Sequence, residues 1–344
     1  MEPQGPGGPK LYALLTQEFA AQASSAIEIV ELSTKTQVGA FSVGSRTVTS
    51  LAVAAGGARL YVPDVGRSEV AVYGSFGDQE GAVELDSPPS DCVLSRSGDV
   101  LYVSTQEGLV AIDTGANKVA AAVTTGADRL VGVAVSPDDK RVGAVAVGPS
   151  PENYGYDPGL YLFDAETLTP TRVEIADPDA PEGAAVLPND VVFADTDRAI
   201  LWDANCDSFY QVDVAAGEQD LAWTVRLGRD AGSSANFDNV LVYSRVAKRA
   251  YALKEFDGWE GWPGLLAILD PRAPEAHTVG GFAAQPFVLA LRPDERKLYV
   301  SAIARFRGGG ADTLDEYDVE ADAFERGIYT FQHEDMSVRD MQVL

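Results

Sequence analysis

Two histidines are the first residues to weigh for proton transfer, because the chain of 344 residues contains only His277 and His333. His333 lies in the run QHEDM, directly before Glu334 and Asp335. An imidazole titrates near neutral pH, so beside carboxylates it can exchange protons with a bound substrate. We therefore predict that His333, Glu334 and Asp335 provide general acid–base chemistry. The alternative for His333 is a hydrogen bond at a strand end, and His277 is interpreted as structural.

Polar residues also precede several apolar runs, each with the length and composition of a strand. They are Arg46, Asp91, Asp128, Arg129, Asn189, Asp190, Asn236 and Asp238, and the aromatic Phe287 stands at a matching position. If those strands occupy equivalent places in a repeated fold, all these residues meet in one polar ring. We predict that Arg46, Asp128 and Arg129 join the catalytic group, with an arginine holding an anionic part of the substrate, and that the others bind the ligand.

Aromatic residues stand in several segments rich in glycine, proline and acidic residues. They are Tyr154, Tyr156, Phe256, Trp259, Trp262 and Phe306, with Arg305 beside the last. Aromatic side chains on such connections often cap a pocket or anchor a partner. We predict that these residues bind the ligand. The alternative is that the rings pack the connections against one another and that Arg305 is solvated.

Other catalytic chemistries leave no motif in the sequence. GxSxG, GxxxxGK, HExxH and CxxC are all absent, and RGGGAD lacks the strand-to-helix context of a dinucleotide fingerprint. The two cysteines, Cys92 and Cys206, lie far apart and fit reduced thiols better than a disulfide framework. We expect no cofactor, no redox catalysis by the chain itself and no phosphoryl transfer.

A repeated strand pattern must position these residues. The stretch RAILWDANCDSFYQVDV recurs in altered form, as in ARLYVPDVGRSEVAVYG and DVLYVSTQEGLVAIDT. Seven positions are equivalent, and neighbours among them are 41 to 58 residues apart: Tyr12, Tyr61, Tyr102, Gly143, Leu201, Tyr251 and Tyr299. Four short strands in each such period are typical of a propeller blade. The sequence therefore predicts an all-β, seven-bladed β-propeller of four-stranded antiparallel blades.

The two ends of the chain complete each other in this scheme. The first copy lacks an entry strand before Lys10, and the alternating run MSVRDMQVL at the C-terminus lacks a blade of its own. We predict that the C-terminal strand joins the N-terminal blade and closes the ring, which leaves no open sheet edge. Residues 1–9 are then a disordered tail, and residues 10–344 form a single domain.

Antiparallel order predicts that the two faces of the ring differ. Turns between the first and second and the third and fourth strands, such as SPDDK and DTGANK, share one face and are short. The other face receives the long segments TQEFAAQASSA, GPSPENYGYDPG, KEFDGWEGWPG and IARFRGGGADTLDEY. Long connections on one side of a rigid scaffold favour a binding or catalytic surface there. We place the predicted site on that face, at the mouth of the central channel.

Three stretches resemble the YVTN family of seven-bladed propellers, whose repeat has the form VSPDG–LYVTN–VxVIDTxTNxV. They are VAVSPDDKRVGAVAV, VLSRSGDVLYVST with GLVAIDTGANKVAAAV, and LALRPDERKLYVSA. The resemblance implies the fold and leaves the function open, because members of the family include redox-enzyme subunits, lactonases, surface proteins and binding modules.

The segment LPNDVVFADTDRAIL is similar to a strand start of gluconolactonase and strictosidine-synthase-like propellers. In the lactonases Asn and Asp at the channel mouth bind a divalent metal, so the resemblance implies Asn189, Asp238 (or Asn236) and Asp335 as ligands if a cation is present. Those relatives have six blades, and no Glu ligand is evident at the closing strand here. We expect no metal.

Charge and composition limit the partners. The formal net charge is −26, from 52 acidic and 26 basic residues, and such a surface repels phosphate backbones and anionic lipid. No run approaches the ~20 apolar residues of a membrane span, and the N-terminus lacks the features of a signal peptide. We expect a cytoplasmic monomer that binds neither nucleic acid nor membrane.

Together these features favour a propeller that binds a small organic ligand in a loop-lined pocket at one channel mouth. If the chain is an enzyme, the expected chemistry is non-redox, of the lyase, cyclase, isomerase or lactone hydrolase type. One alternative is a non-catalytic scaffold that binds a protein partner through the same face. A second alternative is a metal-dependent lactonase-like hydrolase.

Overall fold

A computed structural model describes most of the chain. The described residues are 8–17, 24–44, 47–126, 128–150, 155–180, 186–203, 206–227, 240–254, 264–280, 285–303, 312–332 and 336–344. Within them no helix has the length and apolarity needed to cross a bilayer.

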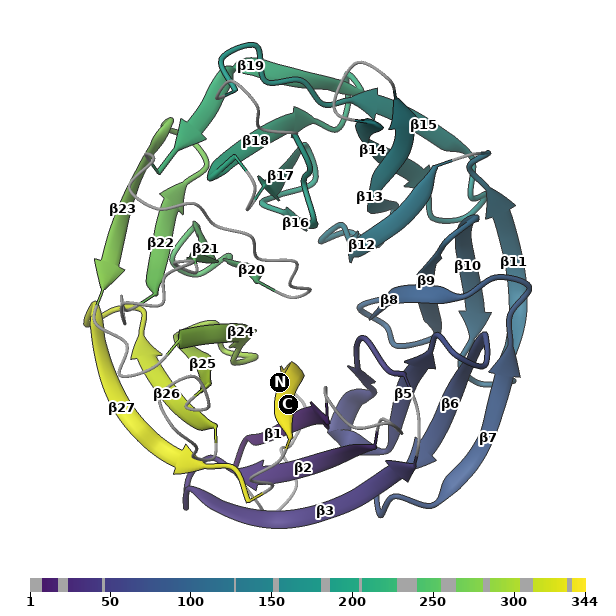
Figure 1. Cartoon of the computed structure of the whole chain (residues 1–344), viewed down its shortest axis with the longest axis vertical. Coiled ribbons are helices and arrows are strands. Elements are labelled where there is room, and N and C mark those ends of the chain that lie inside the picture. Colours follow the sequence, from purple (N-terminus) through teal and green to yellow (C-terminus); the bar gives the residue numbers. More distant parts are fainter. Residues whose placement is uncertain are drawn as a thin grey trace.

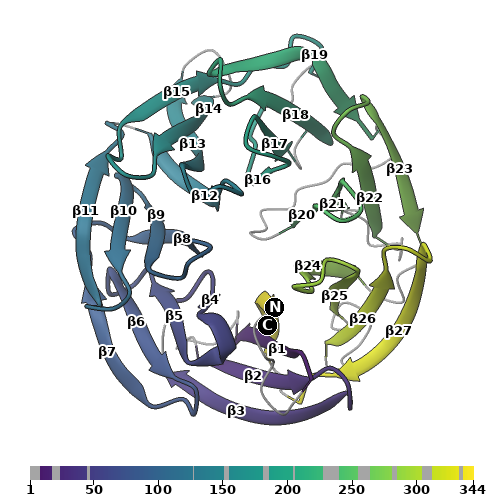
Figure 2. The same ribbon diagram turned by 180° about the vertical axis from the view of Figure 1, so that it is seen from behind.

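Seven four-stranded antiparallel sheets form a ring around a central opening, as Figure 1 shows and Figure 2 repeats from behind. Blade 1 contains β28 (Ser337–Val343), β1 (Lys10–Thr16), β2 (Ser25–Glu31) and β3 (Thr36–Gly44). Blade 2 contains β4 (Ala52–Val53), β5 (Arg59–Asp64), β6 (Glu69–Gly74) and β7 (Gln79–Glu84). Blade 3 contains β8 (Pro89–Leu94), β9 (Val100–Thr105), β10 (Gly108–Asp113) and β11 (Lys118–Thr124). The predicted fold class is confirmed.

The other four blades follow in chain order. Blade 4 contains β12 (Arg129–Val135), β13 (Arg141–Ser150), β14 (Gly155–Asp164) and β15 (Pro170–Glu174). Blade 5 contains β16 (Asp190–Phe193), β17 (Arg198–Asp203), β18 (Ser208–Asp213) and β19 (Glu218–Arg226). Blade 6 contains β20 (Leu241–Ser244), β21 (Arg249–Lys254), β22 (Leu265–Asp270) and β23 (Glu275–Gly280). Blade 7 contains β24 (Gln285–Leu291), β25 (Lys297–Ile303), β26 (Thr313–Asp318) and β27 (Ala323–Thr330).

The ring closes as the sequence predicts. The C-terminal strand β28 pairs with β1 from Leu11↔Val343 to Thr16↔Ser337. Lys10 and Leu344 also exchange two backbone hydrogen bonds, each of 2.9 Å. The innermost strand of blade 1 therefore comes from the opposite end of the chain from its other three strands.

The core lies between neighbouring blades. The two middle strands of a blade are buried along both faces, as in β5 and β6, whereas an outermost strand such as β11 is exposed along nearly its whole length. Tyr61, Tyr251 and Tyr299, equivalent in the sequence repeat, are each about 1% exposed. Blade 4 has Gly143 at this position, and a Cβ there would lie 3.2 Å from the ring of Phe193, which fills the space.

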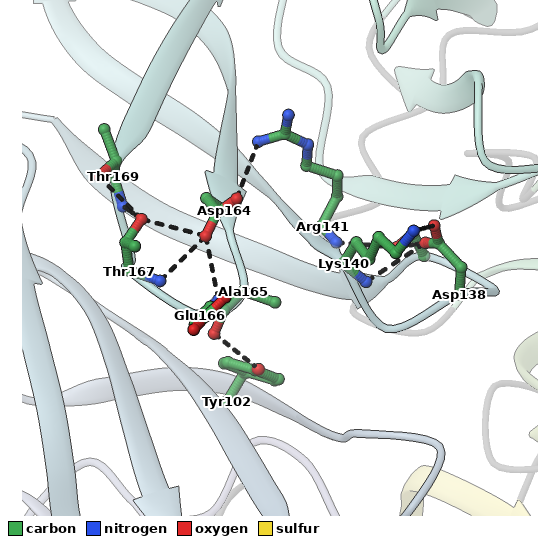
Figure 3. A network of polar contacts seen from close by, with 10 residues as sticks. Tyr102, Asp138, Lys140, Arg141, Asp164, Ala165, Glu166, Thr167 and Thr169 are labelled. Atoms are coloured by element: carbon green, nitrogen blue, oxygen red, sulfur yellow. Dashed lines mark hydrogen bonds and ion pairs between the residues drawn. The ribbon is translucent and has the colours of Figure 1, made fainter.

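The third-to-fourth turns of blades 3, 4, 5 and 7 share one construction. In blade 4 the carboxylate of Asp164 accepts hydrogen bonds from the backbone N–H and the hydroxyl of Thr167, both 3.0 Å, as Figure 3 shows. The fourth residue after it, Leu168, has φ +53°. Three other aspartates accept a bond of 2.8 Å from the third residue after them: Asp113, Asp213 and Asp318. An aspartate that accepts a hydrogen bond from a backbone N–H three residues later, followed by a residue in the left-handed conformation, makes a compact turn.

Candidate functional site

The topology gives the ring two unlike ends. Turns between first and second strands and between third and fourth strands have four or five residues each, and we call the end that holds them the turn end. Second-to-third connections and the crossovers between blades leave from the other end, called the connection end. They include residues 17–24, 255–264 and 304–312 and the crossovers 175–189 and 227–240. The difference in connection length is therefore confined to one end.

In blade 4 the segment GPSPENYGYDPG, which the sequence predicts to be a long loop, belongs mostly to two paired strands. Strands β13 and β14 pair over ten residues each and continue to Ser150↔Gly155, so the segment is an extended hairpin. Pro149 lies beyond the last pair of β13 with β12, Arg129↔Val147, so its missing N–H costs no bond to that strand. Tyr156 belongs to β14, opposite Pro149.

The predicted site residues divide into two groups. Outside the described residues lie Arg46, Tyr154, Asn236, Asp238, Phe256, Trp259, Trp262, Arg305, Phe306, His333, Glu334 and Asp335. Tyr156 is described as part of β14. The other described ones are Asp91, Asp128, Arg129, Asn189, Asp190 and Phe287. These six lie at or near the first residues of β8, β12, β16 and β24, the innermost strands, where those strands start at the connection end. Their roles toward a ligand stay predictions.

Asp91 joins blade 3 to blade 4. Its carboxylate accepts hydrogen bonds from the backbone N–H of Cys92 at 2.7 Å and of Val133, on β12, at 3.1 Å. The side chain is buried, and the loss of hydration raises the pKa of Asp91 to about 6 although both N–H bonds act in the opposite direction. The carboxylate thus satisfies two backbone groups at a blade boundary.

Asp190 makes the same kind of connection between blades 5 and 6. One carboxylate oxygen accepts from the N–H of Val191 at 2.8 Å, and the other accepts from Val240 at 3.1 Å and Leu241 at 2.9 Å. Sequence reasoning missed a third member, Asp340 of β28. Its carboxylate bonds the N–H groups of Met341 and, in blade 2, of Leu51, both at 2.6 Å. We call Asp91, Asp190 and Asp340 the inter-blade aspartates.

Asp128 belongs to a polar cluster at the connection end of blade 4. Its carboxylate accepts from the Tyr161 hydroxyl and from Arg172 Nε, both at 2.9 Å. The Nη2 of Arg172 donates to the carboxylate of Asp157 at 2.8 Å. Burial, followed by the hydrogen bond to Asp128, raises the pKa of Tyr161 to about 12. Asp128 is therefore paired with a buried phenol and a guanidinium that itself holds a second carboxylate.

Blade 5 repeats this combination with other residues. Tyr210, on the third strand as Tyr161 is, donates to Asp177 at 3.2 Å or Asp203 at 3.3 Å. Arg226, on the fourth strand, donates to Asp177. Cys206 lies beside this cluster, and burial followed by the charge of Asp203 raises the pKa of its thiol to about 12. The thiol is protonated at neutral pH and is not a nucleophile in this state.

Two arginines lie at the channel side of the connection end. Arg129 is exposed and is the first residue of β12. Arg339 of β28 donates from Nε to the Thr16 hydroxyl at 3.2 Å, and its guanidinium carbon lies 5.7 Å from the ring centre of Phe287. Sequence reasoning missed Arg339, although its place directly before Asp340 in VRDM was a usable signal. The planar guanidinium group matches the geometry of carboxylate and phosphate.

Asn189 lies where blade 5 approaches blade 4. Its N–H donates to the carbonyl of Trp202 at 3.0 Å. A Cβ on Gly132 of β12 would lie 3.0 Å from the carbonyl oxygen of Asn189, so the close approach favours glycine there. Among the described residues no group of three or more His, Cys, Asp or Glu side chains is arranged to hold a metal ion.

Comparisons with known proteins identify the fold and go no further. No family model matches the chain, and no curated protein matches it. A crystal structure of a protein from Lactobacillus plantarum is 14% identical with a TM-score of 0.68, over 98% of this chain and 99% of that one. A functionally unknown protein from Desulfotomaculum acetoxidans is 13% identical with a TM-score of 0.63, over 97% and 99%. Kuenenia stuttgartiensis hydrazine synthase is 14% identical with a TM-score of 0.61, over 79% and 77%.

Proposed function

We propose that this propeller binds a small organic ligand with an anionic group at the connection end of its channel. The observation that carries the proposal is that three carboxylates at this end already have partners within the protein, while two arginines lie there as well. Asp91 and Asp190 are bonded to backbone N–H groups, and Asp128 is paired with Arg172. Arg129 and Arg339 lie at the same end, in a chain whose net charge is −26. Cations kept at one place in so acidic a chain favour recognition of an anion.

The predicted residues outside the described part supply the rest of the proposed site. Phe256, Trp259 and Trp262 would cover the apolar part of the ligand, because aromatic side chains contribute large contact areas. His333 precedes β28 and would exchange a proton with the ligand, in a non-redox reaction of the lyase, cyclase, isomerase or lactone hydrolase type. The YVTN-like repeats are compatible with such a role, since that family includes lactonases and binding modules.

A thermal-shift screen of small carboxylates, phosphates and neutral molecules tests the binding. The expected hits carry a carboxylate or a phosphate. Arg129→Gln and Arg339→Gln should each weaken the best hit by about tenfold or more, because each removes a charge-assisted hydrogen bond. Lys118→Gln on the exposed strand β11 removes one charge elsewhere and should leave affinity unchanged. The proposal would be contradicted if the hits are neutral molecules. It would also be contradicted if both arginine variants bind the best hit with the affinity of the parent.

Acid–base catalysis is tested on the two histidines. His333→Gln keeps the size and hydrogen bonding of the side chain but removes its titration, so turnover of the hit should fall by ~10² or more. His277→Gln is the matched control and should change nothing, because His277 lies on the outer strand β23. If a bound ligand is not turned over, or if both variants turn it over equally, the site is a binding site without acid–base catalysis by His333.

A further inference from the structure

A cavity at the turn end lies among three neighbouring blades. Its volume is about 390 Å³. The residues that line it come from turns of blades 4, 5 and 6, from the first residue of β17 and from β20: Pro137, Ala194, Asp195, Thr196, Arg198, Tyr243, Arg245, Lys248, Pro271 and Arg272. This size lies within the range of pockets that bind small molecules. The cavity is separate from the connection end, because every one of these turns belongs to the opposite end of the ring.

The lining carries a surplus of positive charge. Arg198, Arg245, Lys248 and Arg272 face one lining carboxylate, that of Asp195. The whole chain has twice as many acidic as basic residues, so this balance is the reverse of its average. Lys248 makes no ion pair with any residue that the structure describes. Carboxylates partner the three arginines, so Lys248 is the cation of the lining that an anion in the cavity would newly pair, and the guanidinium groups would add hydrogen-bond donors.

The three arginines are held in place by carboxylates that leave part of each guanidinium available. Arg198 donates to Asp195 through Nε, at 2.9 Å, and Nη2. Arg245 contacts Glu295 through Nε and Nη2, and a second oxygen of Glu295 accepts from the backbone N–H of Val246 at 3.1 Å.

Arg272 donates from Nε to Asp270 at 3.3 Å. In all three arginines the contacts with described residues use the Nε and Nη2 side. The Nη1 groups of Arg198, Arg245 and Arg272 therefore remain as hydrogen-bond donors toward a ligand.

Tyr243 and the two prolines of the lining indicate what else the ligand carries besides its anionic group. Tyr243 is half-buried, and burial followed by the charge of Asp195 raises the pKa of its phenol, so the hydroxyl is a donor at neutral pH. The ring of Tyr243, with Pro137 and Pro271, gives the cavity apolar surface. We propose that this cavity is a second binding site, which takes a small organic anion with a phosphate or more than one carboxylate next to an apolar group.

Calorimetric titration with phenyl phosphate, citrate and inorganic phosphate, at fixed ionic strength, tests the site. The full chain should bind phenyl phosphate and citrate saturably, and phenyl phosphate more tightly than inorganic phosphate because only the former uses the apolar lining. The double variant Lys248→Gln with Arg272→Gln should weaken binding of phenyl phosphate and citrate by about tenfold or more. Both side chains lie in surface turns, so the melting temperature should stay that of the parent.

The matched control removes the same two charges elsewhere, with Lys118→Gln and Arg326→Gln on the exposed strands β11 and β27. The control should bind like the parent. Equal weakening by both double variants would show an effect of total charge and overturn the site, as would the lack of saturable binding for all three probes. The binding that the Lys248/Arg272 double variant loses should persist in Arg129→Gln, whatever the probes do at the connection end. If Arg129→Gln abolishes all saturable binding and the Lys248/Arg272 variant keeps it, the probes bind at the connection end and the turn-end site is refuted, whereas the proposed function is not.

Discussion

Removal of an inter-blade aspartate should destabilise the whole ring. In Asp190→Ala the N–H groups of Val191, Val240 and Leu241 lose their acceptor, and two of these belong to the next blade. Each buried N–H left without an acceptor costs about 1–3 kcal/mol, and partial hydration of the gap returns some of that, so we expect a total of about 3–6 kcal/mol. At roughly 2 °C per kcal/mol for a chain of this size, the melting temperature should fall by about 6–12 °C.

The assay is thermal unfolding followed by circular dichroism, with an exposed turn aspartate as control. Asp113→Ala removes one acceptor, for the N–H of Ala116, in a turn that water reaches. It should cost about 1 kcal/mol, or roughly 2 °C. The reasoning is refuted if Asp190→Ala melts within about 2 °C of the parent, or no lower than Asp113→Ala.

Three further predictions concern pH, closure and metal. Because burial raises the pKa of Asp91 to about 6 in the folded chain, the folded state holds this proton more tightly than the unfolded state, so the free energy of unfolding should fall from pH 4 to pH 6. The loss should be up to about 3 kcal/mol and should be smaller in Asp91→Asn, as measured by urea unfolding across that range. Deletion of residues 336–344 should abolish cooperative unfolding, because it removes β28, whereas deletion of residues 1–7 should leave the melting temperature unchanged; equal melting would contradict the closure. A chelator should leave the melting temperature unchanged, and a drop restored by calcium or magnesium would support the lactonase-like alternative.

The blade count and the ring closure could be predicted from the sequence because they depend on a period. Four short strands recur every 41 to 58 residues, and the strand missing from the first copy is present at the C-terminus. The forward-bonded turn aspartates, such as Asp113 and Asp164, also follow from local sequence. The hydrogen bonds that their carboxylates accept come from residues two or three positions further along the chain.

The polar partners could not be predicted in the same way. Asp128 bonds Tyr161 and Arg172, which lie 33 and 44 positions away, and no local pattern indicates that pairing. Pro149 and Pro158 made the hairpin at Ser150↔Gly155 look like a loop in the sequence. Pro149 lies beyond the pairing of β13 with β12, and Pro158 lies beyond the pairing of β14 with β15. A recurring signal for the inter-blade aspartates was present, however, because each directly precedes an apolar residue within the innermost strand of its blade, in SDC, NDV and RDM.

The turn end shows a different limit. Its short turns contain the common turn residues Asp, Pro, Arg and Lys, and no local pattern separates Lys248 or Arg272 from other solvated charges. Only the ring brings turns from residues 137, 194–198, 245–248 and 271–272 to one cavity. Sequence reasoning placed function on one end, whereas the structure directs attention to both.

A crystal structure of the chain with the best hit of the thermal-shift screen tests the central claim most directly. We predict that the anionic group of the ligand lies within hydrogen-bond distance of Arg129 or Arg339, at the connection end of the channel. A ligand found only in the turn-end cavity, or only on the outer strands of the ring, would contradict the claim.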